Sequence, residues 1–151
     1  MKKSGLVATL AAGMLLLAAC GSSSKTIDAA ALASSLATDI SYDDTLEQIS
    51  DEDVSMYIEV PEGVKSYVYM GSGSTAEEVA VFEAPDKDTA ATVKTNVQTY
   101  LDDQSDSFQD YIPEESKRIG NAVLEQKDQY VILCVSGDSD GAKEIIEKAF
   151  K

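Results

Sequence analysis

The 151-residue sequence contains no histidine and no tryptophan, and it has only two cysteines and three prolines. Without histidine, the Ser/His and Cys/His pairs of nucleophilic enzymes are excluded, as is the commonest side-chain ligand of transition metals. A pair of carboxylates can still hydrolyse a glycosidic bond, but that chemistry needs a cleft and surfaces that stack on sugars. A short chain without tryptophan offers little of either, so we expect neither an enzyme nor a cofactor.

Basic residues are also scarce, because 12 lysines and arginines face 27 aspartates and glutamates, which gives a net charge of −15. A charge of this sign and size repels phosphate backbones and anionic lipid head groups. We therefore expect no nucleic-acid partner and no direct docking to a membrane surface. The acidity is typical of a protein that must stay soluble in a crowded space.

The N-terminal sequence is typical of exported proteins. Lys2 and Lys3 precede an uncharged stretch, residues 4–19, which is rich in leucine and alanine and ends in Leu17-Ala18-Ala19-Cys20. A basic start, an apolar middle and small residues before a cleavage point form a secretory signal peptide. The stretch is shorter than the ~20 residues that a bilayer-spanning helix needs. Removing Lys2 and Lys3 with the signal takes the net charge from −15 to −17.

The four residues Leu17 to Cys20 resemble the lipobox of bacterial lipoproteins. This resemblance implies that residues 1–19 are removed and that the Cys20 thiol carries a diacylglyceryl group, with acyl chains such as palmitate. Two acyl chains suffice for lasting attachment, at about 0.8 kcal/mol per buried CH₂ group. The protein is then expected to be lipid-anchored on the extracytoplasmic face of the cell membrane. Residues 20–25 would be the lipidated cysteine and a flexible linker, and residues 26–151 one domain.

Hydrophobic periodicity predicts an α+β fold, a single small domain with packed helices on a mainly antiparallel sheet of about four to five strands. Strands are expected at residues 56–60, 66–70, 78–82, 119–126 and 130–135, the last two joined by a turn at Lys127-Asp128. Helices are expected from a cap at Thr26 to residue 40, from Asp86 to about residue 108, from Pro113 over a short stretch, and over residues 141–150. The acidic segment 43–53 is expected to be a loop with one helical turn.

Several phrases of the sequence resemble a family of small lipoproteins from Gram-positive bacteria that carry a domain of unknown function. These phrases are Tyr67-Val68-Tyr69-Met70, Ala76-Glu77-Glu78-Val79-Ala80-Val81-Phe82, Phe108, Tyr111-Ile112-Pro113-Glu114 and Tyr130-Val131-Ile132-Leu133-Cys134-Val135-Ser136. The resemblance covers nearly all of the chain after Cys20. It implies one domain behind a lipobox, and it implies no activity.

The segment from Ser136 to Glu147 contains a spacing like that of a calcium loop. Oxygen-bearing side chains at its first, third and fifth positions, glycine at the sixth and glutamate at the twelfth match an EF-hand loop. Serine replaces the usual leading aspartate, however, and a strand precedes the segment where the motif has a helix. We favour the simpler interpretation that these residues turn the chain and cap the closing helix, with Gly141 easing the turn. Asp138, Asp140 and Glu147 remain the candidate cation ligands.

Four further features have a structural and a functional interpretation. Tyr67 and Tyr69 are expected on one sheet face, as packing or as a binding platform. The Tyr111-Pro113-Glu114 phrase is expected to fix the chain path or to form a recognition loop. Cys134 has no disulfide partner and is expected to be a small buried hydrophobe and not a nucleophile. Glu78 is expected to form a salt bridge or to be exposed, in preference to acting as a general acid.

These observations favour a non-catalytic protein-interaction or accessory module with an envelope protein as partner, without specifying an oligomeric state. The alternative is a lipoprotein that binds a small ligand or a cation. A carboxylate-based hydrolase is the third function considered, and it would need a deep pocket with two close carboxylates.

Overall fold

The computed structural model describes residues 25–151, so the predicted signal peptide and Cys20 lie outside the described residues. Helices and strands alternate irregularly along the chain. The helices are α1 Ala29–Asp39, α2 Asp51–Val54, α3 Lys87–Gln109, α4 Pro113–Gly120 and α5 Ser139–Ala149. The strands are β1 Glu47–Gln48, β2 Lys65–Met70, β3 Glu78–Glu83, β4 Val123–Lys127 and β5 Tyr130–Val135.

The strands form one five-stranded sheet in the order β1-β2-β3-β5-β4, in which every neighbouring pair is antiparallel. This confirms the predicted α+β class with an antiparallel sheet. The tight turn between β4 and β5 is formed by Asp128 and Gln129, one residue later than the predicted Lys127-Asp128, because Lys127 still pairs with Tyr130 in the sheet. Asp128 adopts a positive φ of 52°, a conformation that aspartate tolerates better than most residues.

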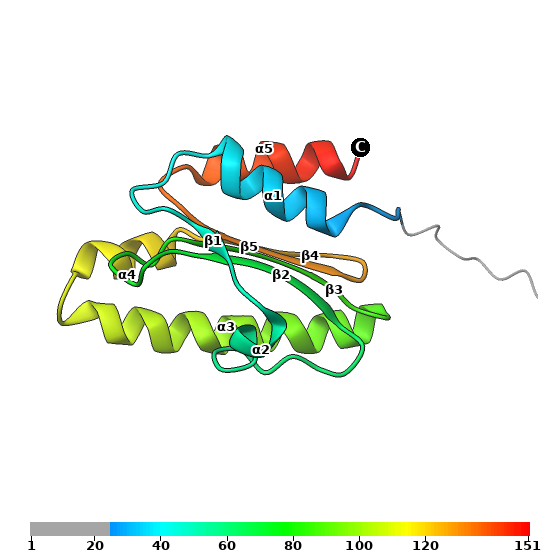
Figure 1. Cartoon of the computed structure of the whole chain (residues 1–151), viewed down its shortest axis with the longest axis horizontal. Helices are drawn as coiled ribbons and strands as arrows, with labels where there is room; N and C mark the ends of the chain where they lie inside the picture. Colours follow the sequence, from blue (N-terminus) through cyan, green and yellow to red (C-terminus); the bar gives the residue numbers. More distant parts are fainter. Residues whose placement is uncertain (1–24) are drawn as a thin grey trace, which may run out of the picture.

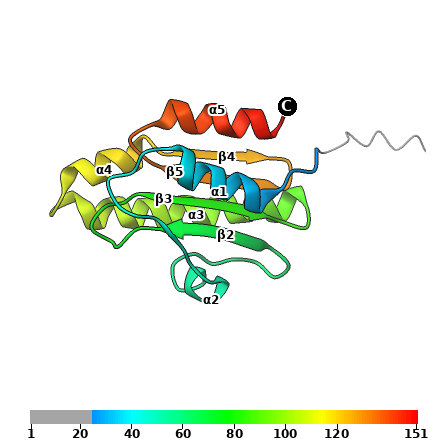
Figure 2. The ribbon, with the colours of Figure 1, turned by 45° about the horizontal axis from the view of Figure 1, so that its top comes forward.

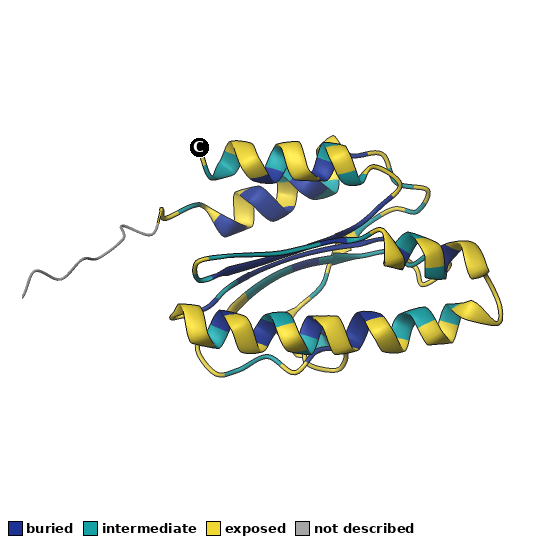
Figure 3. Ribbon diagram, turned by 180° about the vertical axis from the view of Figure 1, so that it is seen from behind, coloured by how far each residue is buried: buried dark blue, intermediate teal, exposed yellow. Residues whose placement is uncertain are grey.

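Helices cover both faces of the sheet. The α1 and α5 helices lie on one face, and α3 lies on the other with α2 and α4 beside it (Figures 1 and 2). The side chains of β5 therefore alternate between two cores, with Val131, Leu133 and Val135 facing α3, and Tyr130, Ile132 and Cys134 facing α1 and α5. Because both faces are covered, this strand is an uninterrupted apolar run (Figure 3).

Side-chain caps fix where most of the helices begin. The carboxylates of Asp28, Asp86 and Asp138 accept hydrogen bonds from backbone N–H groups at the starts of α1, α3 and α5. Pro113 opens α4, where the missing N–H costs nothing. The prediction that Thr26 caps the first helix is wrong, because Asp28 lies directly before the first helical residue and supplies the acceptor.

Two predicted strands differ from the structure. Residues 56–60 form a turn after α2 in which the backbone N–H groups of Met56, Tyr57 and Ile58 donate back to carbonyls of α2. Of these three residues only Ile58 is buried, so the alternation of apolar and polar residues here does not mark a strand with one buried face. The strand predicted to begin at Ile119 begins at Val123, because α4 continues to Gly120 and buries Ile119 against the α3 core.

No helix within residues 25–151 is long and apolar enough to cross a membrane.

Candidate functional site

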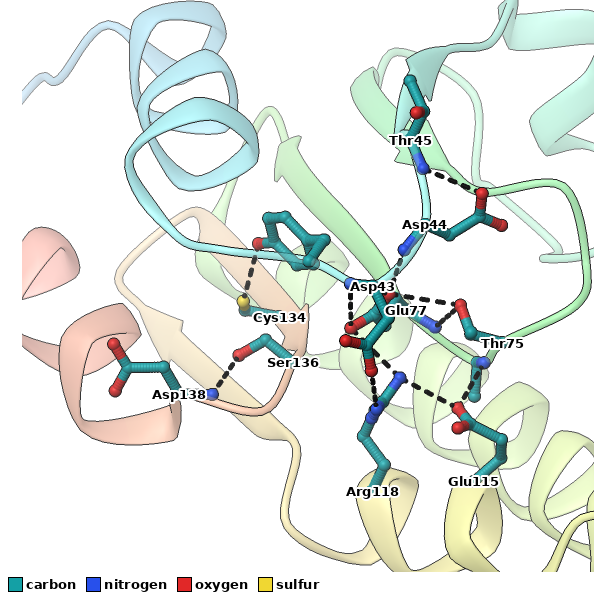
Figure 4. A network of polar contacts seen from close by, with 12 residues as sticks. Asp43, Asp44, Thr45, Thr75, Glu77, Glu115, Arg118, Cys134, Ser136 and Asp138 are labelled. Carbon is teal, nitrogen blue, oxygen red and sulfur yellow. Dashed lines mark hydrogen bonds and ion pairs between the residues drawn. The ribbon is translucent and has the colours of Figure 1, made fainter.

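Four charged side chains meet at one end of the sheet, and we call them the Arg118 cluster: Asp43, Glu77, Glu115 and Arg118 (Figure 4). Arg118 lies on α4 together with Glu115. Asp43 comes from the segment between α1 and β1, and Glu77 directly precedes β3. The cluster therefore joins three parts of the chain that are distant in sequence.

Arg118 is the only arginine in the sequence, and its guanidinium contacts all three carboxylates. Its Nη1 lies 3.0 Å from Glu77 Oε1 and 3.2 Å from Glu115 Oε2, and its Nη2 lies 2.6 Å from Asp43 Oδ2. Burial disfavours the charged guanidinium, but the hydrogen bond to Asp43 and the charges of Glu77 and Glu115 outweigh this effect and raise the pKa of Arg118. The fork of a guanidinium suits such multiple pairing.

Backbone donors complete the hydrogen bonding of the two buried carboxylates. The side chain of Glu77 is only 2% exposed and accepts from the N–H groups of Asp43 and Asp44 at 2.9 Å each. Glu115 Oε2 accepts from the N–H of Ala76 at 2.8 Å. A buried charge of this kind is tolerated only when it is paired and hydrogen-bonded. The cluster thus ties the α1–β1 segment and the β2–β3 loop to α4.

A second polar group lies beside the cluster and involves Cys134. Tyr42 Oη donates to the carbonyl of Leu36 at 2.9 Å and lies 3.5 Å from Cys134 Sγ (Figure 4). Burial raises the pKa of Cys134, against the smaller opposing effect of its hydrogen bonds with Tyr42 and Ser136. The thiol is therefore neutral at physiological pH, which is the opposite of what a nucleophile requires. The prediction that Cys134 is buried is confirmed.

A small cavity of about 90 Å³ adjoins the cluster, between the β2–β3 loop, the start of β3, α3 and α4. Glu78 and Tyr100 line it, and Tyr100 Oη donates to Glu78 Oε2 at 2.9 Å. The expectation that Glu78 is exposed or salt-bridged is wrong, since it is buried at 4% exposure and a tyrosine hydroxyl is its partner. Burial, opposed by the hydrogen bond from Tyr100, raises the pKa of Glu78 to about 7.

The β2–β3 loop that borders this cavity is held in place by Asp44. The Asp44 carboxylate accepts from the backbone N–H and the hydroxyl of Ser72, at 2.6 and 2.7 Å. These hydrogen bonds, first that of the Ser72 side chain and then that of its backbone, lower the pKa of Asp44. Gly71 passes so close that a Cβ there would lie 2.6 Å from Asp44 Oδ2, which explains glycine at this position.

A family model described as a domain of unknown function (DUF4358) matches residues 44–136, more than half of the chain. The chain belongs to this family. The DUF4358 match spans the whole sheet, α2, α3 and α4, and it includes the cavity and every member of the Arg118 cluster except Asp43. No curated protein and no solved structure showed significant similarity to the chain.

A larger groove, of about 460 Å³, lies between α1 and α5, outside the DUF4358 match. Its lining includes Ile27, Leu32 and Ile145 together with exposed polar residues of both helices. It is an open surface hollow that holds no buried ionisable group, whereas the smaller cavity at Glu78 does. Among the described residues, the ionisable groups with clearly shifted pKa values all lie within the DUF4358 region except Tyr42, which lies two residues before it.

The three candidate cation ligands at the C-terminal helix are not brought together. Asp138 caps α5 by accepting from the N–H of Gly141 at 2.9 Å, while Asp140 points to Lys143 and Glu147 to Lys151. Within residues 25–151 no group of three or more acidic or sulfur side chains is arranged to hold a metal ion. Gly141 does not serve the turn as predicted. It lies within α5, where a Cβ would collide with the Asp138 carboxylate.

The remaining predicted residues have separate places. Tyr67 and Tyr69 share one sheet face, as predicted, and are partly buried against the α1 and α5 core, in agreement with packing. Tyr111 is exposed at the corner between α3 and α4. Sequence reasoning missed the Arg118 cluster, although a single arginine in a strongly acidic chain is a signal that could have indicated it.

Proposed function

We propose that this protein is a lipid-anchored lipoprotein of the extracytoplasmic membrane face that acts as a non-catalytic interaction module. The observation that carries this proposal is an exposed apolar surface at the end of the domain opposite the expected lipid anchor. The lipobox resemblance at Leu17 to Cys20 supports the anchor. Membership of the DUF4358 family is compatible with this function and specifies none.

The anchor and the apolar surface are expected at opposite ends of the domain. The described chain enters beside the C-terminal end of α5, whereas the α3–α4 corner lies at the other end of the long axis (Figures 1 and 3). The 23 residues of α3 correspond to a length of about 35 Å. A lipid on Cys20 would be six residue steps from Thr26, a distance of at most ~22 Å in a fully extended chain. The corner would therefore face away from the membrane.

Large apolar side chains are exposed at this corner and on the same side of the sheet. Tyr111 is 87% exposed and Ile112 beside it 38%, while Met56 and Tyr57 follow α2 and are 68% and 52% exposed. Tyrosine is enriched at protein interfaces, because its ring gives a large contact area and its hydroxyl a hydrogen bond.

Exposed acidic residues surround the corner in sequence, namely Asp106, Asp110 and Glu114. An apolar centre with a charged rim is the usual arrangement of a protein interface. The matching partner surface would carry an apolar pocket surrounded by lysine and arginine, and the acidic rim would steer the approach of that partner. We therefore propose an envelope protein with a basic docking surface as the partner.

The polar groups of the domain support a non-catalytic role. The guanidinium of Arg118 is fully engaged by three carboxylates, and Cys134 is a buried, neutral thiol. These groups stabilise the domain instead of facing a substrate cleft.

Site-specific photo-crosslinking in cells tests the proposal. A photoreactive amino acid replaces Tyr111, and a matched control places it at Glu144, which is exposed on α5 on the opposite face. We expect one abundant protein adduct from position 111 and none from position 144. The adduct should disappear when Cys20→Ala prevents lipid attachment and leaves the unprocessed precursor. Equal adducts from both positions, or an adduct that persists in Cys20→Ala, would contradict the proposal.

A further inference from the structure

Glu78 is a buried acid for which the domain supplies no cation. Its side chain points to the α3 side of the sheet, where Ala80 and Phe82 of the same strand also lie. Within residues 25–151 its carboxylate has no ion pair, and its hydrogen bond from Tyr100 is its one polar contact. The nearby Arg118 is already engaged by three other carboxylates. A carboxylate in such a place is unfavourable unless a positive charge is near.

The free oxygen of Glu78 faces the cavity. Oε2 accepts from Tyr100, which leaves Oε1 without a partner among the described residues. Every fully buried side-chain oxygen among the described residues has a hydrogen-bond partner. Because Oε1 has no such partner, it is not fully buried, and the open space beside it is the cavity that Glu78 lines. The cavity of about 90 Å³ thus has room for about three water molecules at ~30 Å³ each, or for a small organic group.

The residues that line the cavity determine which class of ligand it can bind. Aliphatic and aromatic side chains make up much of the wall, namely Met70, Tyr100, Phe108 and Ile119. A divalent cation such as calcium needs six to eight oxygen ligands, and no group of three or more potential metal-binding side chains occurs in residues 25–151. Glu77 also lines the cavity but is already paired with Arg118, so Glu78 is the carboxylate without a cation. One such carboxylate beside apolar and aromatic groups suits a cation that carries its own methylene groups.

We propose that this cavity binds a primary alkylammonium group of about the size of ethylammonium, with the carboxylate of Glu78 as its counter-ion. The ammonium group donates to Glu78 Oε1, while Tyr100 holds Oε2 and so fixes the orientation of the carboxylate. The short alkyl chain contacts Met70 and Phe108. The β2–β3 loop, with Gly71 and Gly73 at the cavity, forms part of the wall. This site is independent of the proposed protein partner.

Nuclear magnetic resonance of the full-length, ¹⁵N-labelled protein in a non-ionic detergent tests this proposal. Ethylammonium chloride is added at pH 8, and potassium chloride at the same concentrations controls for ionic strength. We expect saturable shifts of the backbone amides around Glu78, Gly73 and Tyr100 with ethylammonium, and none with potassium. Shifts that do not saturate, or that potassium reproduces, would overturn the proposal.

A matched pair of variants tests whether the negative charge of Glu78 is the one that binds ethylammonium. Glu78→Gln removes one negative charge at the cavity and should weaken binding at least tenfold. Asp106→Asn removes one negative charge on the exposed surface of α3 and should leave the affinity unchanged. An affinity of Glu78→Gln equal to that of the native chain would overturn the proposal even if the native chain binds.

A titration of the native chain at pH 5 needs no substitution and provides a second test. At this pH Glu78 holds a proton, so we expect at least tenfold weaker binding than at pH 8. The other titratable group facing it is Tyr100 on α3, and burial raises the pKa of Tyr100, so it does not ionise in this range. Cys134 of β5 lies on the opposite face of the sheet, and burial likewise raises its pKa. Glu77 lies beside it and remains paired with Arg118. Equal affinity at both pH values would overturn the proposal.

Discussion

The burial of Glu78 predicts a specific dependence of stability on pH. Its pKa rises from an ordinary value of 4.5 to about 7 in the folded protein. Below pH 4.5 the folded and unfolded chains both hold the proton, and the full stability is present. Between pH 4.5 and 7 the unfolded chain loses the proton while the folded chain keeps it, so the free energy of unfolding falls as pH rises. Above pH 7 the loss is complete.

The size of this loss follows from the same values. Each unit of pKa is worth about 1.4 kcal/mol, so the change from 4.5 to about 7 corresponds to about 3 kcal/mol. Glu78→Gln removes the charge, and its amide oxygen can still accept the hydrogen bond from Tyr100. The variant should therefore be more stable than the native chain at high pH, and its advantage should grow by roughly 2 kcal/mol from pH 5 to pH 9.

Urea denaturation of the full-length protein at several pH values measures this effect. The difference in the free energy of unfolding between native and variant chains removes the pH dependence that the other acidic residues contribute to both. Asp106→Asn serves as a control for the loss of one surface charge. If the difference between the native chain and Glu78→Gln is the same at pH 5 and pH 9, the reasoning about Glu78 is wrong. Ethylammonium must be absent, because a bound cation would compensate for the charge.

Three further predictions concern other parts of the domain. Arg118→Met leaves the two buried carboxylates of the Arg118 cluster without a cation and should lower the free energy of unfolding by about 3–5 kcal/mol in a urea titration. Asp43→Asn changes a side chain that is 73% exposed, so in the same titration it should lower the free energy of unfolding by less than about 1 kcal/mol. Gly141→Ala should destabilise the native chain by about 1 kcal/mol through its collision with the Asp138 cap, but should stabilise the Asp138→Ala variant by up to about 1 kcal/mol through helix propensity. In a double-mutant cycle, equal effects in both backgrounds would refute this coupling. Cys134 should react with a thiol reagent only as fast as the domain opens, and rapid labelling of the native protein would contradict its burial.

Local signals were sufficient for most of the fold. Short-range chemistry places the apolar run of β5, the Asp86 cap and Pro113 at the start of α4 where the structure has them, and it places the β4–β5 turn within one residue. The predictions of secondary structure were wrong where one local sequence pattern fits two different structures. The pattern of residues 56–60 fits a strand and also a turn with one buried residue, and only the packing of α2 decides between them.

The candidate site could not be predicted in the same way, because its members are far apart in sequence. Arg118 meets Asp43 across 75 residues, and Glu78 meets Tyr100 across 22. Neither pair lies within the range of helical or strand periodicity. The acidic segment around Asp138 matches a calcium-loop spacing because that pattern is local, yet in the structure Asp138 is a helix cap.

The claim on which the proposed function depends is lipid attachment at Cys20, and metabolic labelling with an alkyne analogue of palmitate tests it most directly. We expect the native chain to be labelled and to fractionate with membranes. Cys134→Ala should remain labelled, and Cys20→Ala should lose the label and accumulate as unprocessed precursor. A Cys20→Ala chain that still carries the labelled lipid would contradict the anchor and with it the proposed function.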